Sequence, residues 1–248
     1  MYEFNMKNPE NLFRFVCLVV MFTGLSACQQ TGTGSTDATG VVGNEEIAPQ
    51  LRIFPDGLLD GGFTEEYAVT GVDEIGRTYT GEYQIETGGE VVFNGELAIP
   101  LISTLTYSTD ASGQTVTLVT VVFTEYFSSS KPTKYLGNEN SRTGVIMVPE
   151  IQAPIVPLMA SASSSGSLGQ YTGSDASKES IDWSVGEVMD NGFYDVGHSY
   201  LLTDSAGDVL SSENQYFTFD KNGNRTAWSF IAVLPYLGNT LNLTGIRL

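Results

Sequence analysis

The clearest prediction of covalent chemistry in this sequence concerns Cys28. It follows Leu25, Ser26 and Ala27 and precedes two glutamines. A cysteine thiol is a nucleophile, and small side chains directly before it fit the groove of a peptidase. Small residues at this place predict cleavage directly before Cys28. Cys28 is therefore the expected first residue of the mature chain.

The residues before Cys28 have the organisation of an export signal. Residues 1–14 carry Lys7 and Arg14, and residues 15–25 (FVCLVVMFTGL) are almost entirely apolar. A basic region, a short apolar region and small residues before a cut define a secretory signal, whereas a helix needs about 20 apolar residues to cross a membrane. We therefore expect residues 1–27 to be a signal peptide.

The tetrapeptide LSAC resembles the bacterial lipobox, in which the cysteine receives diacylglycerol. The resemblance implies a lipoprotein whose lipidation site is Cys28, with acyl chains such as palmitate as its anchor. Two or more such chains hold a protein stably at a membrane. Gln29 stands where an aspartate would favour retention in the inner membrane. The outer membrane is therefore the expected location, on either face. The alternative is a soluble secreted protein whose ordinary cleavage site happens to contain a cysteine.

The rest of the chain offers little for catalysis. His198 is the only histidine and lies in GHSYLL, at a predicted strand start. No G-x-S-x-G elbow accompanies it, and a transition-metal site would need several histidine or cysteine ligands. We therefore predict no catalytic, cofactor or metal residue, and a structural or exposed role for His198. A pair of carboxylates for glycoside hydrolysis stays open as an alternative, because the chain has 29 Asp and Glu.

The spacing Asp-x-x-Gly recurs four times between apolar runs. Asp at the first position of a turn can accept hydrogen bonds from the backbone ahead of it, and Gly at the fourth can take a positive φ. We therefore predict hairpin turns. A calcium loop at 220–224 (DKNGN) is the alternative, but an EF-hand loop needs Gly at its sixth position and a carboxylate at its twelfth. The four segments are Asp73–Gly76, Asp110–Gly113, Asp204–Gly207 and Asp220–Gly223.

One loop is a candidate for binding. Tyr126, Phe127 and Tyr135 surround a Ser-rich, locally basic stretch, SSSKPTKYLG. Aromatic side chains beside polar loops can stack on sugars or anchor a partner protein. The alternative interpretation places Tyr126 and Phe127 on the core side of a strand and leaves Lys131 and Lys134 as solvated turn residues.

Composition restricts the partners. The formal net charge is −18, and no basic stripe is visible that could neutralise phosphates, so we predict no nucleic-acid binding. An acidic protein is also repelled by anionic head groups, so the lipid and not charge must hold it at the membrane. The other cysteine, Cys17, lies in the signal, and the mature body has no disulfide.

Alternation with a period of two predicts β-structure for the body. Large residues at 79, 83 and 85 alternate with polar ones, and the same period recurs over Trp228–Leu234. This pattern indicates one buried and one exposed face, as in antiparallel sheets. The strongest strand is predicted at 115–127 (TVTLVTVVFTEYF). The expected fold class is all-β, an antiparallel β-sandwich-like body, with a closed barrel as the main rival.

The domain organisation follows from composition. Residues 28–48, which include the lipidated cysteine, are rich in Gly, Thr and Ser and predict a flexible tether. Prolines and then a Ser-rich stretch divide the body. We expect one β module at 49–158, a Ser-rich linker at 159–166 and a second module at 167–248. The alternative is a single β domain over 49–248.

Short motifs spread over residues 65–230 resemble a set of uncharacterised proteobacterial lipoproteins with Gly-, Thr- and Ser-rich β bodies. The resemblance implies strands at 166–172 and 181–185 and no activity or site residue. It rests on VTGVDEIGRTYTGEY, VVFNGELAIP, TEYFSSSKPTKYLG, GSLGQYT, IDWSV and TFDKNGNRTAW.

Together these observations predict a lipid-anchored envelope lipoprotein of the outer membrane with a non-enzymatic binding or structural role. Its expected partners are the membrane, through the lipid, and an envelope protein or glycan. Two alternatives stay open. One is a polysaccharide hydrolase that uses two carboxylates, and the other is a periplasmic small-ligand binder, which needs a deep apolar pocket or a barrel lumen.

Overall fold

The computed structural model describes residues 50–111, 114–141, 143–151, 155–234 and 239–248. These residues form fifteen β-strands and no helix. The signal peptide, Cys28 and the predicted tether lie outside the described residues. The first eight strands are β1 (Gln50–Arg52), β2 (Thr64–Asp73), β3 (Thr78–Thr87), β4 (Val91–Phe93), β5 (Glu96–Ala111), β6 (Gln114–Ser128), β7 (Tyr135–Asn140) and β8 (Val145–Pro149). The others are β9 (Met159–Ser161), β10 (Ser165–Gly173), β11 (Lys178–Val185), β12 (Tyr194–Thr203), β13 (Val209–Phe219), β14 (Arg225–Leu234) and β15 (Asn239–Arg247).

Twelve of these strands close into one barrel. Their order is β3-β2-β15-β14-β13-β12-β11-β10-β8-β7-β6-β5, and β5 pairs with β3 to complete the ring. Strand β4 extends the wall beside β5, and β1 pairs with β9 in a separate two-stranded sheet. The all-β prediction is confirmed. The prediction of a sandwich is wrong, because the two sheet edges that a sandwich would leave free pair with each other.

The predicted division into two tandem modules finds no support. Strands from 64–149 form one arc of a single ring and strands from 165–247 form the other, and the two arcs are joined where β2 pairs with β15 and where β8 pairs with β10. The stretch 159–166, predicted to be a linker, contains β9 and the first residues of β10. Of the prolines before it, Pro149 is the last residue of β8 and Pro157 lies shortly before β9.

The period of two in the sequence decides which side chains fill the barrel. In β3, Tyr79, Tyr83 and Ile85 are buried while Thr80 and Glu82 are exposed. In β14, Trp228, Phe230 and Ala232 are buried in the same way. The strand predicted at 115–127 corresponds to β6, and those at 166–172 and 181–185 to β10 and β11. Alternation was therefore sufficient to place the inner faces of β3 and β14, whereas the strands at 166–172 and 181–185 were implied by the resemblance to other lipoproteins.

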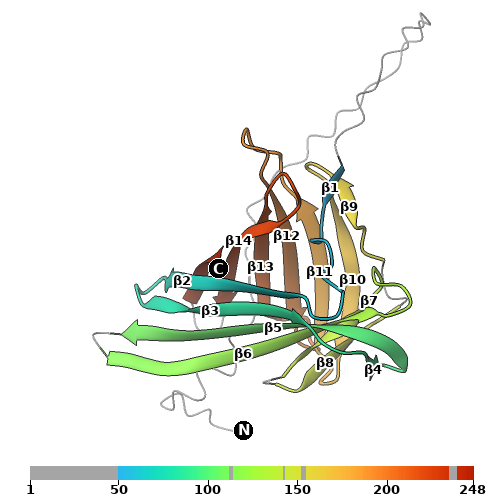
Figure 1. The fold of residues 1–248 in the computed structure, drawn as a ribbon. Coiled ribbons are helices and arrows are strands. Elements are labelled where there is room, and N and C mark those ends of the chain that lie inside the picture. The colour runs from blue at the N-terminus through green and yellow to red at the C-terminus, as the bar shows by residue number, and fades with distance from the viewer. Residues whose placement is uncertain (1–49, 112–113, 142, 152–154, 235–238) are drawn as a thin grey trace, which may run out of the picture.

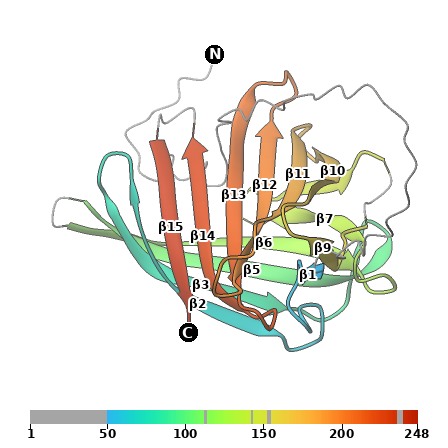
Figure 2. The same cartoon turned by 90° about the horizontal axis from the view of Figure 1, so that it is seen from above.

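The barrel is flattened, so that opposite walls touch. Strands β12–β15 cross β2, β3, β5 and β6 at a steep angle in Figure 2. Across the interior, Tyr83 of β3 stacks on Trp228 of β14 with 4.3 Å between ring centroids, and Phe123 of β6 meets Tyr200 of β12 edge-on. Inward side chains from both walls form one hydrophobic core. The interior is therefore filled with aromatic rings, as in a packed core.

Glycine permits the sharp bending that this flattening requires. Gly81 points inward between Tyr79 and Tyr83, and a Cβ at Gly81 would lie 2.0 Å from the carbonyl oxygen of Thr106 on β5. Gly71 on the neighbouring β2 is equally restricted, because its Cβ would lie 2.2 Å from the oxygen of Asn242. Glycines at these positions let the strands curve against their neighbours without collision.

The two ends of the barrel differ. One end, the turn end, carries the hairpins β2–β3, β5–β6, β7–β8, β10–β11, β12–β13 and β14–β15. The other end, the loop end, carries the longer connections and is covered by a closing segment, residues 51–63, whose Ile53 and Leu58 are buried. The backbone N–H of Ile53 donates to the carbonyl oxygen of Leu158, and the hydroxyl of Thr87 donates to the carbonyl oxygen of Leu58. Figure 1 shows β1 and β9 side by side at this end.

Three of the four predicted Asp-x-x-Gly turns are described, and all three are hairpin turns. Each glycine has a positive φ and donates its N–H to the aspartate carbonyl. In the last of them, the carboxylate of Asp220 accepts from the N–H groups of Asn222 and Asn224. Its oxygens are therefore occupied by the turn, as the hairpin interpretation requires. The turns are Asp73–Gly76, Asp204–Gly207 and Asp220–Gly223, and the tip of Asp110–Gly113 lies outside the described residues.

Candidate functional site

The barrel interior contains an unexpected number of ionisable side chains. Four glutamates point inward from four different strands, and one buried arginine accompanies them. Buried carboxylates are expensive unless they are paired or hydrogen-bonded, so such a cluster is where a functional site is first sought. The residues are Glu65 of β2, Glu125 of β6, Glu179 of β11, Glu213 of β13 and Arg225 of β14.

Two of the glutamates belong to a hydrogen-bonded chain that crosses the interior. The Tyr200 hydroxyl donates to Glu125 Oε1 at 3.4 Å. The amide nitrogen of Asn138 donates to Glu179 Oε2 at 2.6 Å and to the Tyr135 hydroxyl at 3.1 Å. These side chains come from β6, β7, β11 and β12, so the network ties together strands that are far apart in sequence.

Burial changes the acidity of this network. Desolvation raises the pKa of Glu125 to about 7. Desolvation also raises the pKa of Glu179 to about 8, and repulsion from Glu213 and Glu125 adds to it. Both glutamates are therefore protonated in mildly acidic solution and ionise close to neutral pH. Such carboxyls can act as acids or bases, provided that a substrate can reach them.

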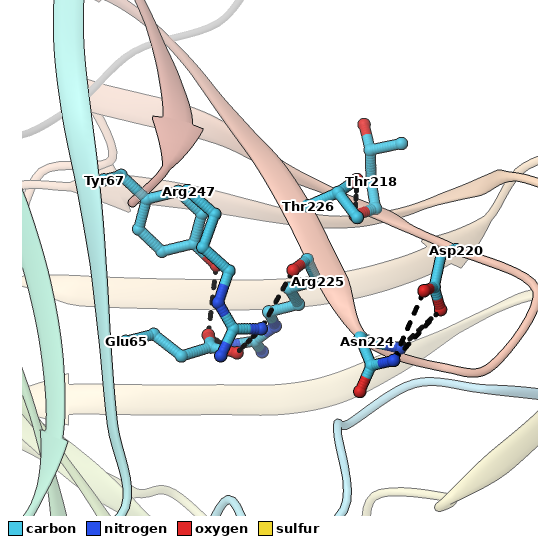
Figure 3. Close-up of polar contacts among 8 residues, drawn as sticks. All are labelled: Glu65, Tyr67, Thr218, Asp220, Asn224, Arg225, Thr226 and Arg247. Carbon is cyan, nitrogen blue, oxygen red and sulfur yellow. Dashed lines mark hydrogen bonds and ion pairs between the residues drawn. The ribbon is translucent and has the colours of Figure 1, made fainter.

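A second cluster holds Glu65 and Arg225. Glu65 receives a hydrogen bond from the Tyr67 hydroxyl at 3.0 Å and lies 3.3 Å from Arg225 and 3.0 Å from Arg247 (Figure 3). The guanidinium of Arg225 also lies over the ring of Phe217, 3.8 Å from its centroid. Glu65 is thus surrounded by donors, and its charge is matched. This cluster joins β2, β14 and β15 near the loop end of the barrel.

The cavity beside these groups is small. It has a volume of about 30 Å³ and is enclosed by the wall together with Phe54 of the closing segment and Val156. That volume holds about two water molecules. Nε of Arg225 has no hydrogen-bond partner among the described residues, so a water here would supply one. The polar lining residues are Tyr83, Ser103, Glu125, Tyr135, His198, Tyr200, Gln215 and Arg225.

His198 is buried in this lining. It lies in the middle of β12, not at a strand start, and its ring is parallel to that of Phe54 at 6.3 Å. Desolvation lowers the pKa of His198 to about 4, so the imidazole is neutral at physiological pH. Of the two predicted alternatives, structural or exposed, the structure places it in the interior.

A second and larger pocket lies on the outside of the barrel. It has a volume of about 240 Å³ and an apolar floor that includes Phe93, Leu136 and Pro149. At its rim Lys134 Nζ lies 2.5 Å from Glu96 Oε2, and Ile151 is 91% exposed. We call it the outer pocket, formed by Phe93, Asn94, Glu96, Lys134, Leu136, Pro149 and Ile151. A hairpin turn at Asn94 and Gly95, both with positive φ, folds Phe93 onto Tyr126, 3.9 Å between centroids.

This pocket adjoins the loop that the sequence singled out. Tyr126 faces outward and contributes to the small outer core of Phe93, Ala98 and Leu136. Phe127 and Tyr135 face the interior and are buried. The alternative interpretation, which placed Tyr126 and Phe127 on the core side, is therefore confirmed for Phe127 and wrong for Tyr126. Lys134 is not merely a solvated turn residue, because it pairs with Glu96.

The inward orientation of the interior glutamates was not predicted from the sequence, although the period of two indicated it. Glu125 lies between Phe123 and Phe127, two residues from each, so the period of two already places it on the inner face. Glu179 stands in the same relation to Ile181, and Glu65 to Tyr67. Without knowledge of the pairing, an acid in a strand is more readily assigned to a solvated position.

Comparison with protein-family models, with curated proteins and with solved structures finds no match for this chain. Among the described residues, no group of three or more His, Cys, Asp and Glu is arranged to hold a metal ion. In the same part of the chain, no helix is long and apolar enough to cross a membrane.

The interior carboxyls predict a pH dependence of stability. Their folded pKa values are about 7 and about 8, against 4.5 for an exposed glutamate. A raised folded pKa means that stability is lost as the pH rises toward it. From pH 6.5 to 8.5 we expect the free energy of unfolding to fall by roughly 2 kcal/mol. His198 opposes this decline only slightly, because it is already neutral in the folded chain and loses the remaining half of its proton in the unfolded chain near the start of this window. Urea unfolding at several pH values measures it.

Substitution separates this effect from the general acidity of the protein. Glu179→Gln should flatten the decline most, and Glu125→Gln less, because the pKa of Glu125 lies nearer the start of the window. Glu82→Gln, on the exposed face of β3, should leave the decline unchanged. Equal slopes in all four proteins would contradict the assignment.

Proposed function

We propose that this protein is a lipid-anchored envelope protein that binds a partner through the outside of its barrel and does not catalyse a reaction. The observation that carries the proposal is the contrast between the two cavities. The interior one holds about 30 Å³, with Phe54 and Val156 in its lining, whereas the outer pocket holds about 240 Å³.

The interior geometry gives little support to the alternatives. A glycosidase needs two carboxylates on either side of a sugar, in a cleft that a polysaccharide can enter. Glu125 and Glu179 are a raised-pKa pair, but the space beside Glu125 is smaller than a sugar ring and lies inside the wall. A small-ligand binder of the lumen type would need several hundred Å³.

The outer pocket has the composition of a protein-binding hot spot. Its apolar floor can receive a bulky side chain, and the Lys134–Glu96 pair at its rim supplies polar contacts. Its volume suits one anchoring side chain better than a whole small molecule. Val92 and Leu97, opposite each other in the β4–β5 hairpin, are 71% and 54% exposed and extend the apolar surface nearby. An envelope protein fits this surface better than a glycan does.

The anchor part of the proposal rests on the LSAC sequence and on Gln29, which favour lipid on Cys28 and the outer membrane. Cys28→Ser should abolish labelling by a radiolabelled fatty acid and move the barrel from the membrane fraction to the soluble fraction. Fractionation followed by immunoblotting measures this. Persistence of the variant in the membrane fraction, as for the unchanged chain, would rule out lipid as the anchor.

The binding part is tested by photocrosslinking in intact cells. A photoreactive amino acid in place of Ile151 should give a discrete adduct of higher mass, because this side chain is exposed at the edge of the outer pocket. The same amino acid at Thr70, exposed on a fully paired part of the wall, is the control. Lys134→Glu should weaken the Ile151 adduct. Adducts of equal intensity from both positions would contradict a partner site at this pocket.

A further inference from the structure

One side of the interior cavity is not formed by the ring of strands. All residues that line the cavity lie in barrel strands except Phe54 and Val156. Phe54 belongs to the closing segment, and its ring meets that of Phe127 edge-on at 6.0 Å and is parallel to that of His198. Phe54 is partly exposed, so the same residue borders both the cavity and the solvent. The closing segment therefore separates the cavity from the solvent on this side.

The closing segment has few polar contacts with the barrel wall. Residues 54–63 form turns of their own and belong to no strand. Thr87 of β3 makes two hydrogen bonds to this stretch, one of them from its hydroxyl to the Leu58 carbonyl. At the start of the segment, the N–H of Arg52 donates to the Tyr194 hydroxyl, but among the described residues β1 pairs with β9 alone. Both ends of the segment thus lie outside the hydrogen-bonded ring.

Two glycines follow the buried part of the closing segment. Gly62 has a φ of +87°, which a residue with a Cβ adopts only with strain. Gly61 has no such φ, and a Cβ there would meet nothing within 4 Å. Neither packing nor backbone conformation therefore requires a glycine at position 61 in the closed structure. Because glycine permits backbone rotations that other residues restrict, this pair is suited to act as a hinge.

The polar groups beneath the closing segment would gain water if it moved outward. Nε of Arg225 is buried beside the cavity and has no hydrogen-bond partner among the described residues. Glu125 and His198 also line the cavity, and burial disfavours the charged form of each. Hydration of these groups offsets part of the cost of exposing Ile53 and Leu58. An open state that leaves the barrel wall intact is therefore accessible.

We propose that the closing segment is a lid, which swings about Gly61 and Gly62 and exposes the interior cavity while the ring of strands stays closed. In the open state, Phe54 leaves its place beside Phe127 and His198. The segment thereby controls the access of solvent to the interior. This inference goes beyond the proposed function, because the closed cavity has room only for about two water molecules.

The accessibility of single cysteines in the folded full-length chain tests the lid. Leu168 of β10 lines the cavity and is 4% exposed, whereas Leu243 of β15 is 1% exposed and is not part of the lining. A small thiol reagent such as methyl methanethiosulfonate should modify Leu168→Cys at least about ten-fold faster than Leu243→Cys. The reason is that opening of the lid exposes the first position without opening the barrel wall. Mass spectrometry of a digest measures the modification at each site.

Two hinge variants test how the lid moves. Gly62→Ala strains the closed conformation and should speed the modification of Leu168→Cys by about five-fold or more. Gly61→Ala fits the closed conformation but restricts the hinge, so it should slow the modification roughly two- to five-fold. Neither variant should change the rate at Leu243→Cys. Equal rates at the two cysteines, a change at both of them in the hinge variants, or no response of Leu168→Cys to either variant would overturn the proposal.

Discussion

The pairing of β3 with β5 is the constraint on which the rest of this structure depends. Ten consecutive residue pairs, from Thr78↔Asp110 to Thr87↔Leu101, turn a long antiparallel sheet into a closed ring. Closure removes two edges that would otherwise expose unpaired backbone groups to other chains. It also encloses every inward side chain. The side chains on the inner faces of the two walls must therefore pack against each other. Aromatic pairs such as Tyr83 with Trp228 fill the space between them.

Closure also explains the chemistry of the interior. A carboxylate inside the ring has no access to bulk water, so it must be neutralised by a proton or by a cation. Glu65 is matched by Arg225 and Arg247, whereas Glu125 and Glu179 have raised pKa values and hydrogen-bond donors. These features are compatible with a role in fixing how strands from distant parts of the chain meet. The cavity beside Glu125 has a volume of about 30 Å³.

Much of the local structure could be predicted from the sequence. The alternation around Tyr83 and Trp228 placed inner and outer faces correctly, and Asp73, Asp204 and Asp220 marked hairpin turns, because both signals depend only on neighbouring residues. Closure of the barrel could not be predicted, because it depends on pairing between β3 and β5, which are not consecutive strands. A period of two with one buried face is also the same in a sandwich and in a barrel. The outer pocket could not be predicted either, because it also depends on contacts between residues that are far apart in the sequence. It forms only when the Asn94–Gly95 hairpin places Phe93 against Tyr126 and Leu136, which lie more than thirty residues away.

The closed ring is tested most directly by a disulfide across the closing pair. Thr80 and Ser108 are register partners on the outer face, and their hydroxyl oxygens lie 3.4 Å apart. The double variant Thr80→Cys/Ser108→Cys should oxidise as readily as Thr70→Cys/Thr244→Cys, a partner pair between β2 and β15 that does not close the ring. Mass spectrometry of a digest identifies each bond. Oxidation of both pairs is the predicted result, and a reduced 80–108 pair beside an oxidised 70–244 pair would contradict closure.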